Sequence, residues 1–157
     1  MCVKDMKLSL EYIAGFVDGD GCIFLTKREH RTYKWRTKYV SLSCGFNIAN
    51  CNKTILEEIR AFFNIGKVYP LYRHNHPKWK QWFGYQVNGL KIRTVLEKLA
   101  PLLRVKRKQA KLVLQFIRIR EEQFKETNWK NGQRCPYDSR LFGLQEEVSA
   151  LNKRGPD

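Results

Sequence analysis

Two carboxylates stand where a helix would end, a setting that could hold a metal ion. Ser9 can cap a short helix with Glu11 in its first turn, and this helix would run into Asp18 and Asp20. The carboxyl end of a helix carries partial negative charge, so each acid there costs about 0.3–1 kcal/mol. A cation would relieve this conflict, and hard cations such as Mg²⁺ take oxygen ligands. The alternative is that the Asp-Gly-Asp-Gly run is simply a turn.

The same stretch contains small residues that would let a second backbone approach. Ala14, Gly15 and Gly19 lack bulk at roughly helical spacing. Residues 12–21 read YIAGFVDGDG and resemble the signature of the LAGLIDADG homing endonucleases, with Leu, Leu, Ile and Ala of that motif replaced by Ile13, Phe16, Val17 and Gly19. The sequence contains one copy of the motif, which is similar to the single-motif members of the family.

The resemblance implies roles for the residues of this helix. Asp20 would be the acidic metal ligand and the Gly19 carbonyl the neighbouring backbone ligand, for Mg²⁺ or another divalent cation such as Mn²⁺. Asp18 would fix the helix end through hydrogen bonds, because residues two apart do not share a helix face. A single-motif chain would meet a second copy helix to helix, through Tyr12, Ile13, Gly15, Phe16 and Gly19.

Composition points to one domain with a polyanionic partner. The 157 residues are 43% hydrophobic, and 30 Lys and Arg against 15 Asp and Glu leave a net charge of +15. Nucleic acid is the first candidate partner and an acidic membrane surface the second. Apolar runs are too short to span a bilayer and the start is too polar for a secretory signal, so we expect an intracellular protein without a membrane partner. Five cysteines without a C-x-x-C pair are expected to be reduced thiols.

The hydrophobic pattern places the elements that must position these residues. After the first helix, alternation predicts strands at 22–28 and 40–48, then a helix to about residue 63 capped by Asn52 or Thr54, then strands at 67–72 and 82–87. Helices are predicted at 90–103, 104–120 and 141–151, with Val105 on the apolar face of the second. The fold class is α+β, an αββαββα half-saddle with a four-stranded antiparallel sheet. Its core covers about residues 8–120 of a single domain, and a C-terminal helical extension covers about 121–152.

One face of such a sheet would be left uncovered and polar, which suits it to base edges in a major groove. Together with basic residues of loops and helices, the predicted DNA-binding set is Phe24, Thr26, Arg28, His30, Arg36, Lys38, Ser41, Ser43, Asn47, Lys67, Arg73, Gln86 and Lys108.

A second stretch similar to the family lies at residues 101–110, PLLRVKRKQA. By this resemblance Lys106 takes the place of the basic residue near the scissile phosphate, where a cation could stabilise the transition state. Lys108 and Gln109 are weaker candidates. The alternative is a solvated basic helix that touches phosphates for affinity only, which is the first interpretation for Arg104 and Arg107.

Asn50 corresponds to a polar position that in relatives helps order water around the metal. The family often has Gln there, followed a few positions later by a basic residue. Here Lys53 or Thr54 stands nearby, so that role has moved to Lys53 or is absent. Asn50 as an ordinary residue at the start of a helix is the alternative.

Two other groups carry weaker signals. His74 and His76 lack a third nearby ligand, so contact between a hairpin tip and phosphate is preferred over a metal site. Trp35, Trp79, Trp82 and Trp129 could stack on bases, but aromatic residues at strand positions usually belong to the core or its rim.

The resemblance implies a site-specific homing endonuclease. Two copies would make a metal-dependent double-strand break in a long pseudo-palindromic DNA target, with intron RNA as a further candidate partner. The alternative is a protein of the same fold that does not cut: an intron RNA maturase or a DNA-binding regulator.

Overall fold

The computed structural model describes residues 8–31, 38–72, 80–126 and 136–153. In chain order the elements are α1 (Leu10–Asp20), β1 (Gly21–Arg31), β2 (Lys38–Asn50), α2 (Lys53–Phe63), β3 (Lys67–Leu71), β4 (Trp82–Asn88), a 3₁₀ turn η1 (Leu90–Ile92), α3 (Arg93–Leu99), α4 (Arg107–Glu126) and α5 (Ser139–Leu151). The predicted α+β class and the antiparallel four-stranded sheet are confirmed. The strands lie in the order β1-β2-β4-β3.

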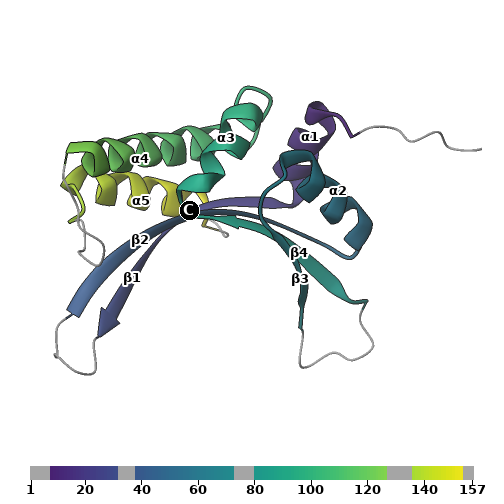
Figure 1. Cartoon of the computed structure of the whole chain (residues 1–157), viewed down its shortest axis with the longest axis horizontal. Helices are drawn as coiled ribbons and strands as arrows, with labels where there is room; N and C mark the ends of the chain where they lie inside the picture. Colours follow the sequence, from purple (N-terminus) through teal and green to yellow (C-terminus); the bar gives the residue numbers. More distant parts are fainter. Residues whose placement is uncertain (1–7, 32–37, 73–79, 127–135, 154–157) are drawn as a thin grey trace, which may run out of the picture.

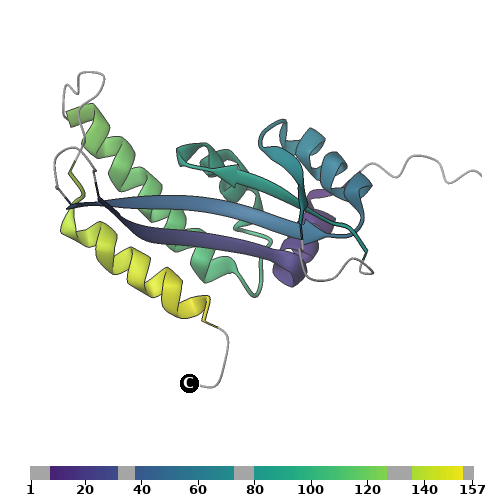
Figure 2. The same cartoon turned by 90° about the horizontal axis from the view of Figure 1, so that it is seen from below.

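The sheet forms an arch with the described helices on its convex side (Figure 1). Alternation explains this arrangement, because Ile23 and Leu25 of β1 and Phe46 and Ile48 of β2 are buried beneath the helices. Seen from below in Figure 2, the strands run along the molecule, and α4 and α5 flank the end where β1 and β2 project. The concave side is left to the polar residues of the strands.

Side-chain caps define where the helices begin. The Ser9 hydroxyl accepts a hydrogen bond from the backbone N–H of Tyr12 at 3.2 Å, which confirms Ser9 as the cap of α1. The Asn52 side chain caps α2 by accepting from the backbone N–H groups of Thr54 and Ile55. Asn64 ends α2 in the left-handed conformation with φ 52°.

The boundaries of α3 and α4 differ from the prediction. The segment at 90–103 is helical only as η1 and α3, and α4 begins at Arg107 and continues to Glu126. Val105 therefore precedes the helix and is 71% exposed, so its placement on an apolar helix face was wrong. The physical reason is that the backbone N–H groups of residues 104–106 are bonded to Asp18 and not to a preceding helical turn.

The C-terminal helix closes the convex side. Leu141, Leu144 and Val148 of α5 are buried, and the Asn152 side chain donates to the backbone carbonyl of Ile23 in β1 at 2.8 Å. Arg120 of α4 is also buried, with its guanidinium 4.3 Å from the ring centroid of Tyr137. Within the described ranges, the helices are too short or too polar to cross a membrane.

Candidate active site and nucleic-acid face

Asp18 joins the end of α1 to the start of α4. Its carboxylate accepts hydrogen bonds from the backbone N–H groups of Arg104 at 2.7 Å, Lys106 at 3.0 Å and Val105 at 3.3 Å. Burial by itself raises the pKa of Asp18, but these three bonds and the charge of Lys106 outweigh it, so the pKa lies below its ordinary value of 3.8. Asp18 thus binds the backbone of the turn that leads into α4, 86 to 88 residues further along the chain.

The same contact fixes the position of Lys106. Its ammonium group donates to the backbone carbonyl of Asp18, one of the carbonyls at the end of α1 that the helix itself leaves unpaired. This cation also meets the negative end of the α1 dipole, and α1 has no basic residue in its own last turn. The Lys106 ammonium group is therefore held at a backbone carbonyl two positions before Asp20.

Asp20 has no cationic side chain paired with its carboxylate within the described residues. It is exposed, and its Oδ2 accepts a hydrogen bond from Nδ2 of Asn50 at 3.2 Å. The Asn50 amide is itself oriented, since its Oδ1 accepts from the backbone N–H of Asn52 at 2.8 Å. A carboxylate at a negative helix end, oriented but not neutralised, suits a bound cation.

The donor atoms at this helix end fit a hard divalent metal. Asp20 offers carboxylate oxygen and Gly19 a backbone carbonyl at the end of a helix, and Mg²⁺ prefers such oxygen ligands. No cluster of three or more His, Cys, Asp or Glu occurs among the residues the structure describes.

Lys53 lies at the first position of α2, three residues after Asn50. Its ammonium group stands 5.8 Å from the ring centroid of Phe83. Phe83 is the strand partner of Asn50, so Lys53 is close to this end of the sheet. The backbone of Thr54 serves the cap of α2.

The polar side of the sheet carries side chains that orient one another. Thr26 Oγ1 lies 2.9 Å from Ser43 Oγ, and His30 Nε2 lies 2.7 Å from Ser41 Oγ. Gln86 on β4 donates to Asn88 at 3.0 Å. Such bonds hold the groups in place before any ligand arrives.

The rest of the predicted DNA-binding set is spread over several positions. Phe24 and Asn47 alternate with buried residues on β1 and β2, and Arg28 lies in the exposed outer half of β1. Lys67 of β3 lies opposite Gln86 of β4. Lys38 shares its side of β2 with Val40 and Leu42, the side that the helices cover, and Lys108 is exposed on α4. Arg36, Arg73, Trp35, Trp79, Trp129, His74 and His76 fall outside the described residues.

Sequence reasoning missed several residues of the polar face. Asn88 extends β4 one residue past the predicted end, and alternation from Gln86 would have found it. Tyr39 stacks on His30 with ring centroids 4.7 Å apart, and it precedes the predicted start of β2. Strand ends are the least certain part of a pattern, which is why both were missed.

One side of α1 is exposed and apolar. Tyr12 is 52% exposed and its ring stacks on Phe16 at a centroid distance of 6.1 Å. A Cβ built on Gly15 or Gly19 would meet no atom within 4 Å, so this side has open space. Ile13 is different: it is completely buried within the chain and belongs to the core, not to an exposed contact surface.

Comparison with known proteins places this site in a family. The family model described as LAGLIDADG endonuclease matches residues 13–120. The DNA endonuclease I-CvuI of Chlorella vulgaris is 37% identical over 114 residues, covering 71% of this chain and 65% of that protein. I-CreI of Chlamydomonas reinhardtii is 29% identical over 117 residues, covering 74% of this chain and 67% of that protein. The chain thus spans about two thirds of the length of these relatives.

Solved structures share the fold. The crystal structure of I-CvuI in complex with the I-CreI target in the presence of 2 mM Mg gives a TM-score of 0.57 at 24% identity, covering 93% of this chain and 96% of that one. The archaeal intron-encoded homing endonuclease I-Vdi141I complexed with DNA gives a TM-score of 0.67 at 20% identity, covering 94% and 86%. The motif helix, the arched sheet and the matched range agree: this chain belongs to the LAGLIDADG endonuclease family.

Proposed function

We propose that the chain is a homing endonuclease that, as a homodimer, makes a divalent-metal-dependent double-strand break in a long, roughly palindromic DNA target. It would act within the cell or organelle that holds this DNA. The observation that carries the proposal is the end of α1, where Asn50 orients an exposed Asp20 carboxylate and the ammonium group of Lys106 donates to the backbone carbonyl of Asp18. Family membership and the DNA-cutting relatives support the same reading.

Each residue at the helix end has a chemical task in this proposal. Asp20 and the Gly19 carbonyl would hold Mg²⁺ or Mn²⁺, which when bound supplies Lewis-acid stabilisation of charge on phosphate oxygens and lowers the pKa of water. Asn50 would keep the Asp20 carboxylate turned toward the phosphate, and Lys106 would stabilise the negative charge that develops there. Attack of water at phosphorus would release the 3′ oxygen and leave a 5′ phosphate.

The exposed side of α1 would be the contact between two copies. Tyr12, Gly15, Phe16 and Gly19 are available there, and Val105 is exposed next to the end of the helix. A two-fold contact of this side would bring the two Asp20 carboxylates together at the dyad. The two polar sheet faces would then lie on successive parts of one duplex, with hydrogen-bonding side chains toward base edges.

The experiment is a cleavage selection. A library of randomised DNA duplexes is incubated with the protein and Mg²⁺, cut molecules are recovered, and the enriched sequence is synthesised. The proposal expects a preferred, roughly palindromic site that is cut on both strands with Mg²⁺ and left intact with EDTA. The absence of cutting under any divalent metal, together with tight binding to intron RNA, would replace the nuclease by the non-cutting maturase alternative.

A further inference from the structure

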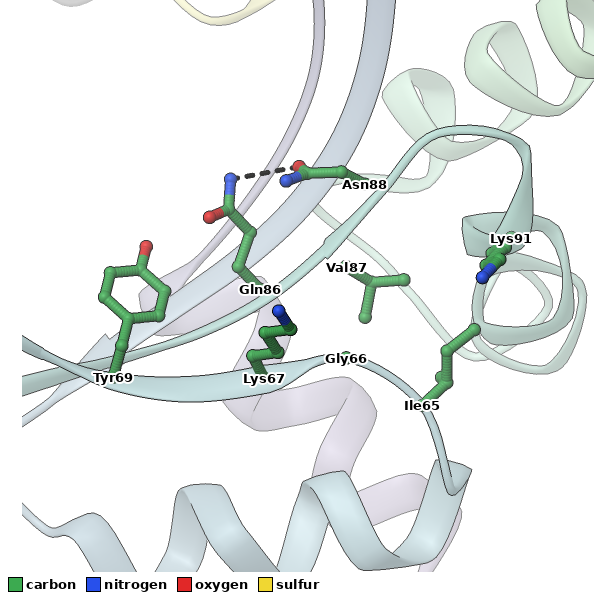
Figure 3. Close-up of a pocket in the computed structure, with 8 residues that line it drawn as sticks. All are labelled: Ile65, Gly66, Lys67, Tyr69, Gln86, Val87, Asn88 and Lys91. Atoms are coloured by element: carbon green, nitrogen blue, oxygen red, sulfur yellow. Dashed lines mark hydrogen bonds between the residues drawn. The ribbon is translucent and has the colours of Figure 1, made fainter.

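A pocket at the outer edge of the sheet has a composition suited to an anion. It measures about 350 Å³ and lies between the start of β3, the end of β4 and η1. Its lining residues are Ile65, Gly66, Lys67, Tyr69, Gln86, Val87, Asn88 and Lys91, among which there are two lysines and no acid. In Figure 3 the two lysine side chains stand on either side of Val87, with the bonded Gln86 and Asn88 amides beside them.

The polar groups of this pocket offer mainly hydrogen-bond donors. Nε2 of Gln86 donates to Oδ1 of Asn88, and the NH₂ group of Asn88 is a further donor. Lys67 and Lys91 are exposed and make no salt bridge within the part of the chain that the structure describes. A lysine acts as a point charge that binds phosphate.

Gly66 lines the pocket where the start of β3 approaches β4 closely. Gly66 has φ +88°, and a Cβ built on it would lie 2.7 Å from the backbone oxygen of Gln86 and 2.8 Å from the side chain of Val87. Glycine is therefore required here both by its conformation and by the close approach of β4. The first residues of β3 can in this way lie directly against the end of β4.

The position of Lys67 on the edge strand β3 indicates which part of a DNA duplex would reach the pocket. Cys22, Asn47, Gln86 and Lys67 form one row across β1, β2, β4 and β3 on the polar face. Three strand spacings of about 4.8 Å place the two ends of this row about 14 Å apart. The major groove is only about 12 Å wide, so an edge strand meets the sugar-phosphate backbone while the inner strands meet bases.

We propose that this pocket holds a backbone phosphate of the bound DNA, gripped by Lys67 and Lys91. The inference rests on the proposed DNA binding and assigns Lys91, Asn88 and Gly66 to it. The contact contributes affinity and register without sequence information, because phosphates are the same at every base pair. Gln86 keeps its base-reading role, with its amide orientation fixed by Asn88.

The test uses the duplex recovered by the cleavage selection, with Ca²⁺ in place of Mg²⁺ to measure binding by fluorescence anisotropy. The double variant Lys67→Gln/Lys91→Gln should lower the slope of log affinity against log salt by about 0.9, the value for one phosphate. Its affinity deficit relative to the unmodified protein should accordingly shrink about 3.5-fold between about 50 and 200 mM salt. Discrimination against duplexes with a single changed base pair should be the same in both proteins.

Lys98→Gln/Lys111→Gln is the matched control, because both lysines are exposed in the helix layer, on α3 and α4, and the pair loses the same charge. A Lys67→Gln/Lys91→Gln variant with the slope of this control would overturn the phosphate assignment. An unchanged slope with altered base-pair discrimination would overturn it in favour of base reading. Failure of the unmodified protein to bind the duplex would instead contradict the proposed function itself.

Discussion

Two roles are possible for Lys106: stabilising the transition state of cleavage, or contacting a phosphate for affinity only. Its ammonium group donates to the backbone carbonyl of Asp18, so its charge has a defined place at the end of α1 that is proposed to hold the metal. Lys106→Gln should slow single-turnover cleavage by about 10²–10³-fold, the usual cost of one lost electrostatic contact to a transition state. Binding affinity should change little.

Lys98→Gln provides the control for this measurement, since Lys98 is an exposed residue of α3 that loses the same charge. Both variants are compared at saturating protein under the same metal. A cleavage rate for Lys106→Gln that matches this control would remove Lys106 from the chemistry and leave it as a phosphate contact.

Asp18 gives a prediction about stability and pH. Asp18→Asn should lower the free energy of unfolding at neutral pH by about 1–1.5 kcal/mol, the difference between hydrogen bonds to a charged and to a neutral acceptor. The folded-state pKa of Asp18 is lowered, so its contribution is complete above the ordinary value of 3.8 and is lost as pH falls through the lower folded value. Urea denaturation of both proteins at pH 7 and below pH 3.8 should show the gap closing in acid.

Asp18 and Asp20 show which residue roles could be predicted from the sequence and which could not. The motif singled out both acids and separated their roles, and the structure confirms that Asp18 fixes the helix end. The partners of Asp18 could not be predicted, because they are backbone groups 86 to 88 residues away and no side-chain pattern identifies them. The exposure of Val105 follows from those same bonds, so it was missed as well.

At the scale of elements, the exposed side of α1 makes the dimer testable without disturbing the fold. A Cβ on Gly15 meets no atom within 4 Å in the chain, and replacing a helical glycine usually stabilises a helix by about 0.5–1 kcal/mol. Gly15→Leu should therefore keep or raise the melting temperature while filling the space that a second α1 would occupy. Sedimentation should show a monomer, and DNA cutting should be lost.

Gly143→Leu is the control for that substitution. Gly143 lies on α5, is exposed, and likewise has no atom within 4 Å of a built Cβ. This variant should remain dimeric and active. If Gly15→Leu sediments as the same dimer as the control, the contact between copies does not run through this side of α1.

Periodicity predicted the elements of this fold better than their ends. Buried apolar residues occupy every second position in the first half of β1 and from Leu42 to Ile48 of β2, so both strands were found. The strand order β1-β2-β4-β3 depends on which edges meet in space, and alternation within a strand does not encode it. The shorter α3 and the later start of α4 reflect tertiary hydrogen bonds that outweigh a continuous apolar pattern.

At the scale of the whole molecule, the net charge of +15 predicts how affinity depends on salt. Each phosphate neutralised by a cation contributes about −0.9 to the slope of log affinity against log salt. For a duplex that makes at least six such contacts, affinity should fall by about 10³-fold or more between about 50 and 200 mM salt. Nearly constant affinity over that range would show that the basic residues do not face phosphates.

The most direct test of the account compares binding and cutting in one protein, Asp20→Asn. This substitution keeps the size of the side chain and its contact with Asn50 while removing the charge that would hold the metal. The selected duplex is incubated in Mg²⁺ with the variant or the unmodified protein, and anisotropy and strand cleavage are followed in parallel. We predict that both proteins bind the duplex with similar affinity and that only the unmodified protein cuts it. Cutting by Asp20→Asn at the unmodified rate would contradict the account.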